Sequence, residues 1–137
     1  MVNMRIVHVS FGVLAVVCLL TGCSGPTGVA QTKPGLPDGV VLDPMNGESA
    51  AMWIERDETF AIVTWGSSSC PPIPTTLTVE GADRIAVTFE ASPNDPCTAN
   101  MAPTTHEFEL PSEITVSPIV VEVSYEDWSE TESLTLD

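Results

Sequence analysis

Basic side chains are scarce in this chain of 137 residues, which has four Lys and Arg against nineteen Asp and Glu. Proteins that bind nucleic acid gather Lys and Arg to neutralise phosphates, and no such cluster occurs here. The composition therefore argues against a nucleic-acid partner. So acidic a surface would attract a basic protein, a cationic peptide or a divalent cation, but it also keeps a protein soluble without any partner.

Catalytic and metal-binding motifs are missing as well. Beyond residue 22 the chain has a single histidine, His106, whereas a blue-copper site needs two with a free cysteine. No Gly-x-Ser-x-Gly turn is present, and no run of acidic residues has the spacing of a calcium loop. We therefore expect a protein that is not an enzyme and that holds no cofactor and no metal.

Sequence alone leaves weaker alternatives open. A hydrolytic site would combine Ser69, His106 and Asp95, although a serine-rich turn and a hydrogen-bonded, partly buried histidine explain the same residues. Cations could be held by Asn94-Asp95 or by Glu126-Asp127, which carry the best-placed carboxylates. Copper would need His106 together with the scattered methionines, which we expect to serve in packing: Met45, Met52 and Met101.

The first residues read as a secretory leader. Arg5 precedes an apolar run, Val9 to Leu20, which is too short to span a bilayer because about 20 residues are needed. A basic start, a short apolar segment and small residues at its end are typical of a secretory signal.

The leader ends in Leu20-Thr21-Gly22-Cys23, which resembles the lipobox of bacterial lipoproteins. The resemblance implies that the Cys23 thiol is acylated and that the bond before it is cut. Acyl chains would hold the protein stably on the membrane. We therefore expect a lipid-anchored protein on the extracytoplasmic face of the cell membrane; an ordinary secretory signal with a chance cysteine is the alternative.

Two cysteines remain once Cys18 leaves with the leader and Cys23 carries lipid. Outside the cytoplasm, Cys70 and Cys97 are most simply a disulfide, which would stabilise the fold by about 3 to 4 kcal/mol. A metal pair or a catalytic cysteine is the alternative, but both need a free thiolate. Loss of Arg5 also leaves three basic side chains against nineteen acidic ones, a net formal charge of −16.

We expect three parts: a signal peptide at 1–22, a flexible tether at 23–46 rich in Gly, Pro and Thr, and one domain at 47–137. Within the tether, Val40 to Leu42 is a candidate first strand. The domain alternates short β-like runs with turns, and we expect strands at 51–55, 59–65, 75–80, 84–90, 104–110, 114–116, 120–125 and 131–136. The run 51–55 reads alternatively as one turn of helix.

This pattern predicts an all-β fold, a small disulfide-clamped β-sandwich, with a small barrel as the variant. It has the size of an immunoglobulin domain but not its pattern, because Trp65 precedes Cys70 and the two cysteines are too close in sequence. In the run 59–65, Phe60 and Ile62 face one way and Ala61 and Val63 the other, so both faces are apolar and a doubly covered strand is expected.

The segments Gly66-Ser67-Ser68-Ser69-Cys70-Pro71-Pro72 and Cys97-Thr98-Ala99-Asn100-Met101-Ala102-Pro103-Thr104-Thr105 resemble a group of small bacterial lipoproteins with no assigned activity. This second resemblance implies a shared disulfide-clamped core and no particular chemistry.

Trp128 is the residue that most suggests a contact. A large aromatic in the acidic turn after Tyr125 either anchors a partner, where tryptophan is enriched, or folds back over the sandwich edge. The sequence therefore predicts a membrane-anchored, non-enzymatic module of the cell envelope that binds an envelope or extracellular protein. A module for a small ligand or cation is the alternative, and a Ser/His hydrolase a remote one.

Overall fold

The computed structural model describes residues 29–137, so the predicted signal peptide and Cys23 lie outside the described residues. Within them, no helix is long and apolar enough to cross a membrane. Eight strands make up the fold, as the predicted all-β class requires: β1 (Gln31–Pro34), β2 (Ala50–Glu55), β3 (Thr59–Gly66), β4 (Ile73–Gly81), β5 (Arg84–Glu90), β6 (Ala102–Glu109), β7 (Ile119–Tyr125) and β8 (Thr131–Leu136).

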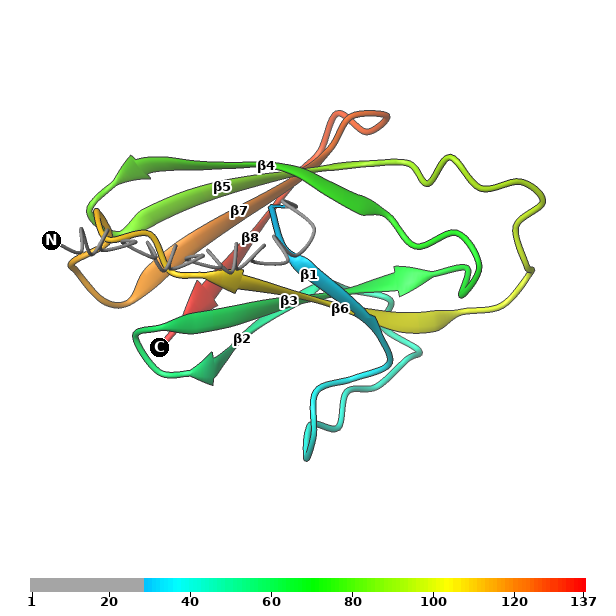
Figure 1. Ribbon diagram of the computed structural model, residues 1–137, viewed down its shortest axis with the longest axis horizontal. Coiled ribbons are helices and arrows are strands. Elements are labelled where there is room, and N and C mark those ends of the chain that lie inside the picture. The colour runs from blue at the N-terminus through cyan, green and yellow to red at the C-terminus, as the bar shows by residue number, and fades with distance from the viewer. Residues whose placement is uncertain (1–28) are drawn as a thin grey trace, which may run out of the picture.

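The strands form two four-stranded sheets that pack face to face, in the orders β1-β6-β3-β2 and β4-β5-β7-β8 (Figure 1). Neighbouring strands are antiparallel except for β5 and β7, which run parallel. They run parallel because β6, in the other sheet, carries the chain back along the sandwich. The strand β7 therefore starts at the end of the sandwich where β5 also starts. The predicted β-sandwich is confirmed.

Every second residue of the central strands points into the space between the sheets, as the two-residue period of a strand dictates. Phe60 and Phe108 stack there with ring centroids 5.1 Å apart, opposite Ile85, Val87 and Phe89 of β5. Each of these side chains is buried, and full burial of one such side chain is worth about 1.5 to 3 kcal/mol. The core is therefore the interface of the two sheets.

The strand β3 is buried on both faces, as predicted. Ala61 and Val63, which point away from the core, are as fully buried as Phe60 and Ile62. The segment 35–49 lies on the outer side of this sheet, below it in Figure 1. The Thr105 hydroxyl donates to the Gly35 carbonyl at 2.7 Å, which joins this segment to the strand next to β3.

The first strand is not where the sequence placed it, and the prediction of a strand at 40–42 is wrong. The Val40 amide donates to the Pro37 carbonyl in a local turn, and Val41 is 92% exposed, so a strand there would bury nothing. Instead, β1 pairs with β6, where Lys33 lies opposite Thr105 and forms an ion pair with Glu107. The predicted tether 23–46 therefore contributes a strand to the sheet.

The other strands and turns form where the sequence predicts them, with one exception. The hairpins β2–β3, β4–β5 and β7–β8 all form, so 51–55 is a strand and not a turn of helix. The predicted strand at 114–116 is wrong. The amides of Thr115 and Val116 both donate to the Ala82 carbonyl, at 2.9 and 3.0 Å, so this segment caps the β4–β5 turn instead of pairing along an edge.

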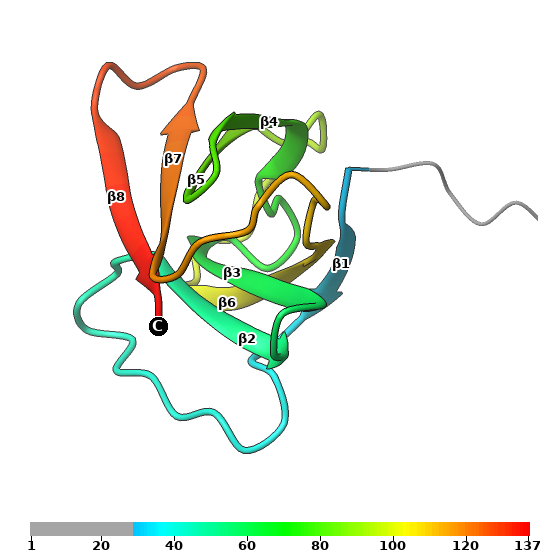
Figure 2. The same ribbon diagram turned by 90° about the vertical axis from the view of Figure 1, so that its left-hand side faces the viewer.

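The predicted disulfide between Cys70 and Cys97 is present. Cys70 lies in the connection from β3 to β4 and Cys97 in the connection from β5 to β6, so the bond joins two segments that each cross between the sheets. We call this the disulfide end, on the right of Figure 1. The opposite end, where the β2–β3 and β4–β5 turns lie, is the entry end, which faces the viewer in Figure 2. The first residue of β1 lies nearer to this end, because Gln31 pairs with Glu107 close to the last residue of β6.

Candidate functional site

His106 lies in the core and is held from both sides. Its Nδ1 is 3.0 Å from the Thr32 hydroxyl of β1 and its Nε2 is 3.0 Å from the Thr64 hydroxyl of β3. Phe89 from the other sheet meets the ring edge-on at 4.9 Å. In a neutral imidazole one nitrogen donates and the other accepts, and the two threonine hydroxyls take the complementary roles.

Burial lowers the pKa of His106 from 6.5 to about 4, because the charged ring would lose its hydration. The side chain is therefore neutral at pH 7 and both of its nitrogens are already used. Its role is to join β1, β6 and β3, which agrees with the predicted hydrogen-bonded histidine, although the ring is fully rather than partly buried.

The structure does not bring Ser69 to His106. The Ser69 hydroxyl accepts from the Thr98 amide at 2.9 Å, and the Ser69 carbonyl accepts from the Asn94 side chain at 2.7 Å. The serine-rich turn therefore binds the loop around Cys97, and the two motifs of the second resemblance contact each other. The predicted Ser69-His106-Asp95 arrangement is not assembled by these contacts.

The candidate metal ligands are also separate. Across residues 29–137, no group of three or more His, Cys, Asp and Glu side chains is placed to hold an ion. Met45 and Met101 are 88% and 63% exposed, whereas His106 is fully buried, so these two side chains do not reach it for copper. The Asn94 side-chain nitrogen donates to the Ser69 carbonyl, and this hydrogen bond fixes the orientation of the Asn94 amide.

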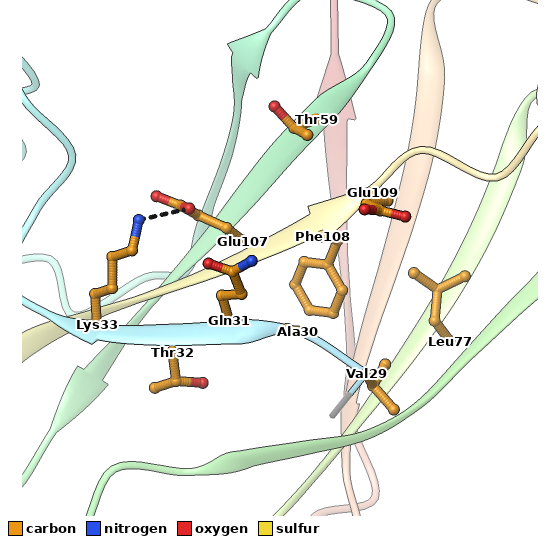
Figure 3. Close-up of a pocket in the computed structure, with 10 residues that line it drawn as sticks. All are labelled: Val29, Ala30, Gln31, Thr32, Lys33, Thr59, Leu77, Glu107, Phe108 and Glu109. Atoms are coloured by element: carbon orange, nitrogen blue, oxygen red, sulfur yellow. Dashed lines mark hydrogen bonds and ion pairs between the residues drawn. The ribbon is translucent and has the colours of Figure 1, made fainter. Parts of the chain in front are cut away.

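A hollow of about 870 Å³ opens between the edges of the two sheets, where β1 and β4 are not paired. Its apolar lining includes Phe108, with Val29 and Leu77 on the same side of that ring (Figure 3). Two of its three charged members, Lys33 and Glu107, form an ion pair at 2.7 Å, drawn as a dashed line. The third, Glu109, is in no ion pair among the described residues and gives the hollow a net negative charge.

A smaller hollow, about 300 Å³, lies at the disulfide end beside Trp128. The β7–β8 turn carries Trp128, whose amide donates to the Tyr125 carbonyl at 3.0 Å. Across from it lie the end of β5 and the connection before β4. The hollow is lined by residues of these three segments: Pro72, Phe89, Glu90, Ala91, Tyr125, Glu126, Asp127 and Trp128.

Trp128 is 66% exposed, so it does not fold into the sandwich. Its one described aromatic contact is edge-on with Tyr125, with centroids 6.2 Å apart and planes at 75°. The alternative in which Trp128 folds back over the sandwich edge is thus realised only as this edge contact. Most of the indole is left free at the rim of the hollow.

Tyr125, in contrast, is fixed. Its ring stacks on Phe89 with centroids 5.5 Å apart, and its hydroxyl lies 3.2 Å from the Ser49 hydroxyl. Burial raises the pKa of Tyr125, the Ser49 hydrogen bond lowers it, and the nearby Glu132 carboxylate raises it further. The tyrosine therefore forms a rigid wall behind Trp128.

The carboxylates at this hollow repel each other. The negative charge of Glu90 is the main reason that the pKa of Glu126 is raised, with desolvation, a hydrogen bond between the two carboxyls and Asp127 adding to it. No basic side chain lines this hollow. The basic side chains within 29–137 are engaged elsewhere: Lys33 with Glu107, Arg84 with Glu122, and Arg56 with the Asp137 main-chain oxygen at 2.8 Å.

The sequence singled out Trp128 but missed its surroundings. Pro72, Glu90 and Tyr125 are at least 18 residues apart in sequence. They meet because β4 pairs with β5, with Ile73 opposite Glu90, and β5 pairs in parallel with β7, with Phe89 opposite Tyr125. The sequence signal that could have located these neighbours is that three of the predicted strands have an end at the same end of the sandwich. Of the other predicted site residues, Cys70 and Cys97 are bonded, and Cys23 lies outside the described residues.

Comparison of the chain with protein-family models, curated proteins and solved structures gives no match.

Proposed function

We propose that this protein is a bacterial lipoprotein held on the extracytoplasmic face of the cell membrane through Cys23, whose domain binds a protein partner and catalyses no reaction. The anchor rests on the lipobox resemblance of Leu20 to Cys23. The binding role rests on one observation, the exposed indole of Trp128 at the rim of a hollow. Tryptophan dominates the binding energy of many protein interfaces because it buries a large area at small conformational cost.

The short distance between anchor and domain supports display of the disulfide end. Only seven residues lie between Cys23 and Gln31, the first residue of β1, and the eight steps from one to the other span at most about 28 Å when the chain is fully extended. Since β1 begins nearer the entry end, that end is the closer one to the anchor. The nine residues of β4 span about 30 Å, so the disulfide end can reach farther from the membrane than the entry end.

The anchor is tested by membrane fractionation of cells that produce Cys23→Ala. We expect the wild-type protein to partition into detergent with the membrane fraction and the variant to appear unlipidated and released or incompletely processed. Cys18→Ala is the matched control, since it removes a leader cysteine outside the lipobox, and it should behave like wild type. A Cys23→Ala protein that is processed and retained like wild type would contradict the anchor.

The binding surface is tested by placing a photo-crosslinking residue at Asp127, beside Trp128, or at Glu58, in the β2–β3 turn of the entry end. In intact cells we expect a discrete crosslinked product of defined mass from position 127, its loss when Trp128→Ala is added, and no such product from position 58. Products that are the same from both positions, or that persist without the indole, would contradict the proposal.

A small-ligand module remains the second candidate, supported by the volume of the hollow over Phe108, which falls in the range of ligand sites. Phe108, Val29 and Leu77 offer apolar surface to such a ligand. An environment-sensitive apolar dye should then be displaced by Leu77→Trp, which fills the hollow, and be unaffected by Trp128→Ala. A dye that does not bind would remove this candidate.

A further inference from the structure

The hollow beside Trp128 combines an aromatic wall with acidic side chains, and this combination restricts what it can bind. The faces of tryptophan and tyrosine rings carry negative charge density that attracts cations within about 6 Å of the ring centre. Trp128 presents most of its ring to solvent, and Tyr125 is held behind it by Phe89 and Ser49. The aromatic wall is therefore partly preorganised before any partner arrives.

Three carboxylates share this hollow with the aromatic rings: Glu90, Glu126 and Asp127. The Glu126 amide donates to the Phe89 carbonyl at 3.0 Å, which keeps the β7–β8 turn close to the end of β5 and so holds Glu126 near Glu90. The proximity of the two carboxylates raises the pKa of Glu126. A positive charge placed between them would relieve that repulsion.

The protein supplies no such charge itself. Among the described residues, Lys33 and Arg84 form ion pairs on the strands and Arg56 binds the Asp137 oxygen at the entry end. The hollow's own lining is acidic and apolar only. Complementary charge must therefore come from the partner.

We infer that the hollow beside Trp128 binds a Lys or Arg side chain of a basic segment of the partner protein, with the cation between the indole and the carboxylates of Glu90 and Glu126. The aliphatic stem of that side chain lies along Pro72 and Tyr125, since long basic side chains bury their methylene groups on apolar surface while the charge stays at the rim. This inference rests on the proposed use of the disulfide end for binding a protein.

The apolar lining favours a side chain over a bare metal ion. Pro72, Phe89 and Ala91 provide no oxygen or nitrogen side-chain ligand, and in the described part of the chain no cluster fits an ion. A hydrated divalent cation would gain little from the aromatic and proline surfaces, whereas a lysine or arginine stem contacts them directly.

The test is a titration of the protein, isolated as the cell processes it and kept in non-ionic detergent, with hexa-arginine, hexa-lysine, hexa-glutamate and a neutral Gly-Ser hexapeptide. The three indole N–H signals of the chain are followed by NMR, and that of Trp128 is assigned by its absence in Trp128→Phe. We expect the two basic peptides to shift the Trp128 signal and leave the other indoles nearly unchanged, and the acidic and neutral peptides to have no effect.

Matched charge variants separate a local site from general attraction. The pair Glu90→Gln with Glu126→Gln should weaken hexa-arginine binding about 10-fold, which is about 1.4 kcal/mol. The control pair Glu58→Gln with Glu113→Gln removes the same charge at the entry end and should weaken binding by less than about 3-fold. Equal losses in the two pairs would overturn the inference, because binding would then follow the net charge alone.

The peptide titration tests the cationic occupant, and the crosslinking tests the protein partner, so either proposal can be wrong without the other. If the neutral or acidic peptide shifts Trp128 as strongly as hexa-arginine, or if no peptide does, the cationic occupant is wrong. The proposed binding role still stands in that case, provided that crosslinking from Asp127 depends on Trp128. If that crosslinking is absent while hexa-arginine binds locally, the site chemistry is right and the protein partner is wrong.

Discussion

The two ends of the sandwich are closed by different interactions. At the entry end, the Trp53 indole and the Arg56 guanidinium both donate to the Asp137 main-chain oxygen, at 2.9 and 2.8 Å, and so join β2 to the end of β8. At the disulfide end, the connections are joined by one covalent bond and by hydroxyl groups of Ser and Thr. There the tryptophan is 66% exposed instead of hydrogen-bonded.

At one end the aromatic and basic side chains stabilise the fold, and at the other end the aromatic and acidic side chains are accessible to a partner. At the entry end an aromatic side chain and a basic side chain serve the fold, so neither is free for a partner. At the disulfide end the covalent bond restrains the loops without using the nearby aromatic and acidic groups, so Trp128, Glu90 and Glu126 stay accessible. Substitutions at the two ends and between them test this division, and the loss of the disulfide is expected to be the most destabilising.

Removal of the disulfide should have the largest effect. The double variant Cys70→Ser with Cys97→Ser opens a loop of 27 residues, and the expected loss is about 3 to 4 kcal/mol of unfolding free energy. Urea denaturation at pH 7 measures it. A loss below about 1 kcal/mol would mean that the Ser and Thr contacts hold the disulfide end without the covalent bond, and the comparison of the two ends would fail.

Acid should weaken the middle of the sandwich through His106. The folded pKa of about 4 lies below the unfolded value of 6.5, so the stability from this group is complete above pH 6.5 and is lost as the pH falls towards 4. The expected loss is about 3 kcal/mol, at about 1.4 kcal/mol per pKa unit. Because the many carboxylates also titrate, the quantity to measure is the difference between wild type and His106→Gln.

We expect that difference in unfolding free energy to shrink from pH 7 to pH 4, since glutamine does not gain a proton. Thr32→Val is a useful companion, because it removes one hydroxyl partner of the ring but leaves the histidine. A difference that is the same at both pH values would show that His106 is not buried neutral.

Single substitutions at the two ends should differ in their effect on stability. Arg56→Gln removes a hydrogen bond to Asp137 and should lower the unfolding free energy by about 1 kcal/mol. Trp128→Ala removes an exposed side chain and should change it by less than about 0.5 kcal/mol while abolishing the proposed binding. Thermal or urea denaturation compares them directly. A Trp128→Ala variant that is the less stable of the two would make the indole structural.

The smallest expected effect is a change in the pKa of Tyr125 when Glu132 is substituted. Glu132 Oε2 is buried without a hydrogen-bond partner among the described residues, and its charge raises the pKa of Tyr125. Glu132→Gln should therefore lower that pKa but leave it above the ordinary value, since burial is the larger cause. The chain has one tyrosine, so absorbance titration reports it alone. An unchanged pKa would place the Glu132 charge away from the wall of the hollow.

Strand pattern and turn residues predicted most of the fold. The alternation of Ile85, Val87 and Phe89 marked β5, and Gly81 to Asp83 marked the turn before it, because both are local properties of the chain. The β1 strand was missed because none of its four residues is apolar enough to signal a strand. It is held by side-chain pairing with Glu107 and His106, which lie 74 residues away.

The candidate site also has one part that the sequence could predict and one part that it could not. Trp128 was visible as an aromatic in an acidic turn, whereas its neighbours depend on which strands meet. Parallel pairing of β5 and β7 brings Glu90 to Glu126 and Phe89 to Tyr125, and no local pattern encodes that pairing. Sequence could thus identify the residue but not the hollow.

The strongly acidic charge, the two-residue hydrophobic period and the two cysteines of the folded part follow from the amino-acid sequence, because composition and period are properties of the chain alone. Three further properties depend on the packing of the sheets: Trp128 stays exposed, His106 is neutral and hydrogen-bonded on both sides, and the basic side chains of the domain are engaged away from the hollow. Exposure, pKa and charge balance at a point depend on distances between residues far apart in the chain, and those distances exist only once the two sheets have packed.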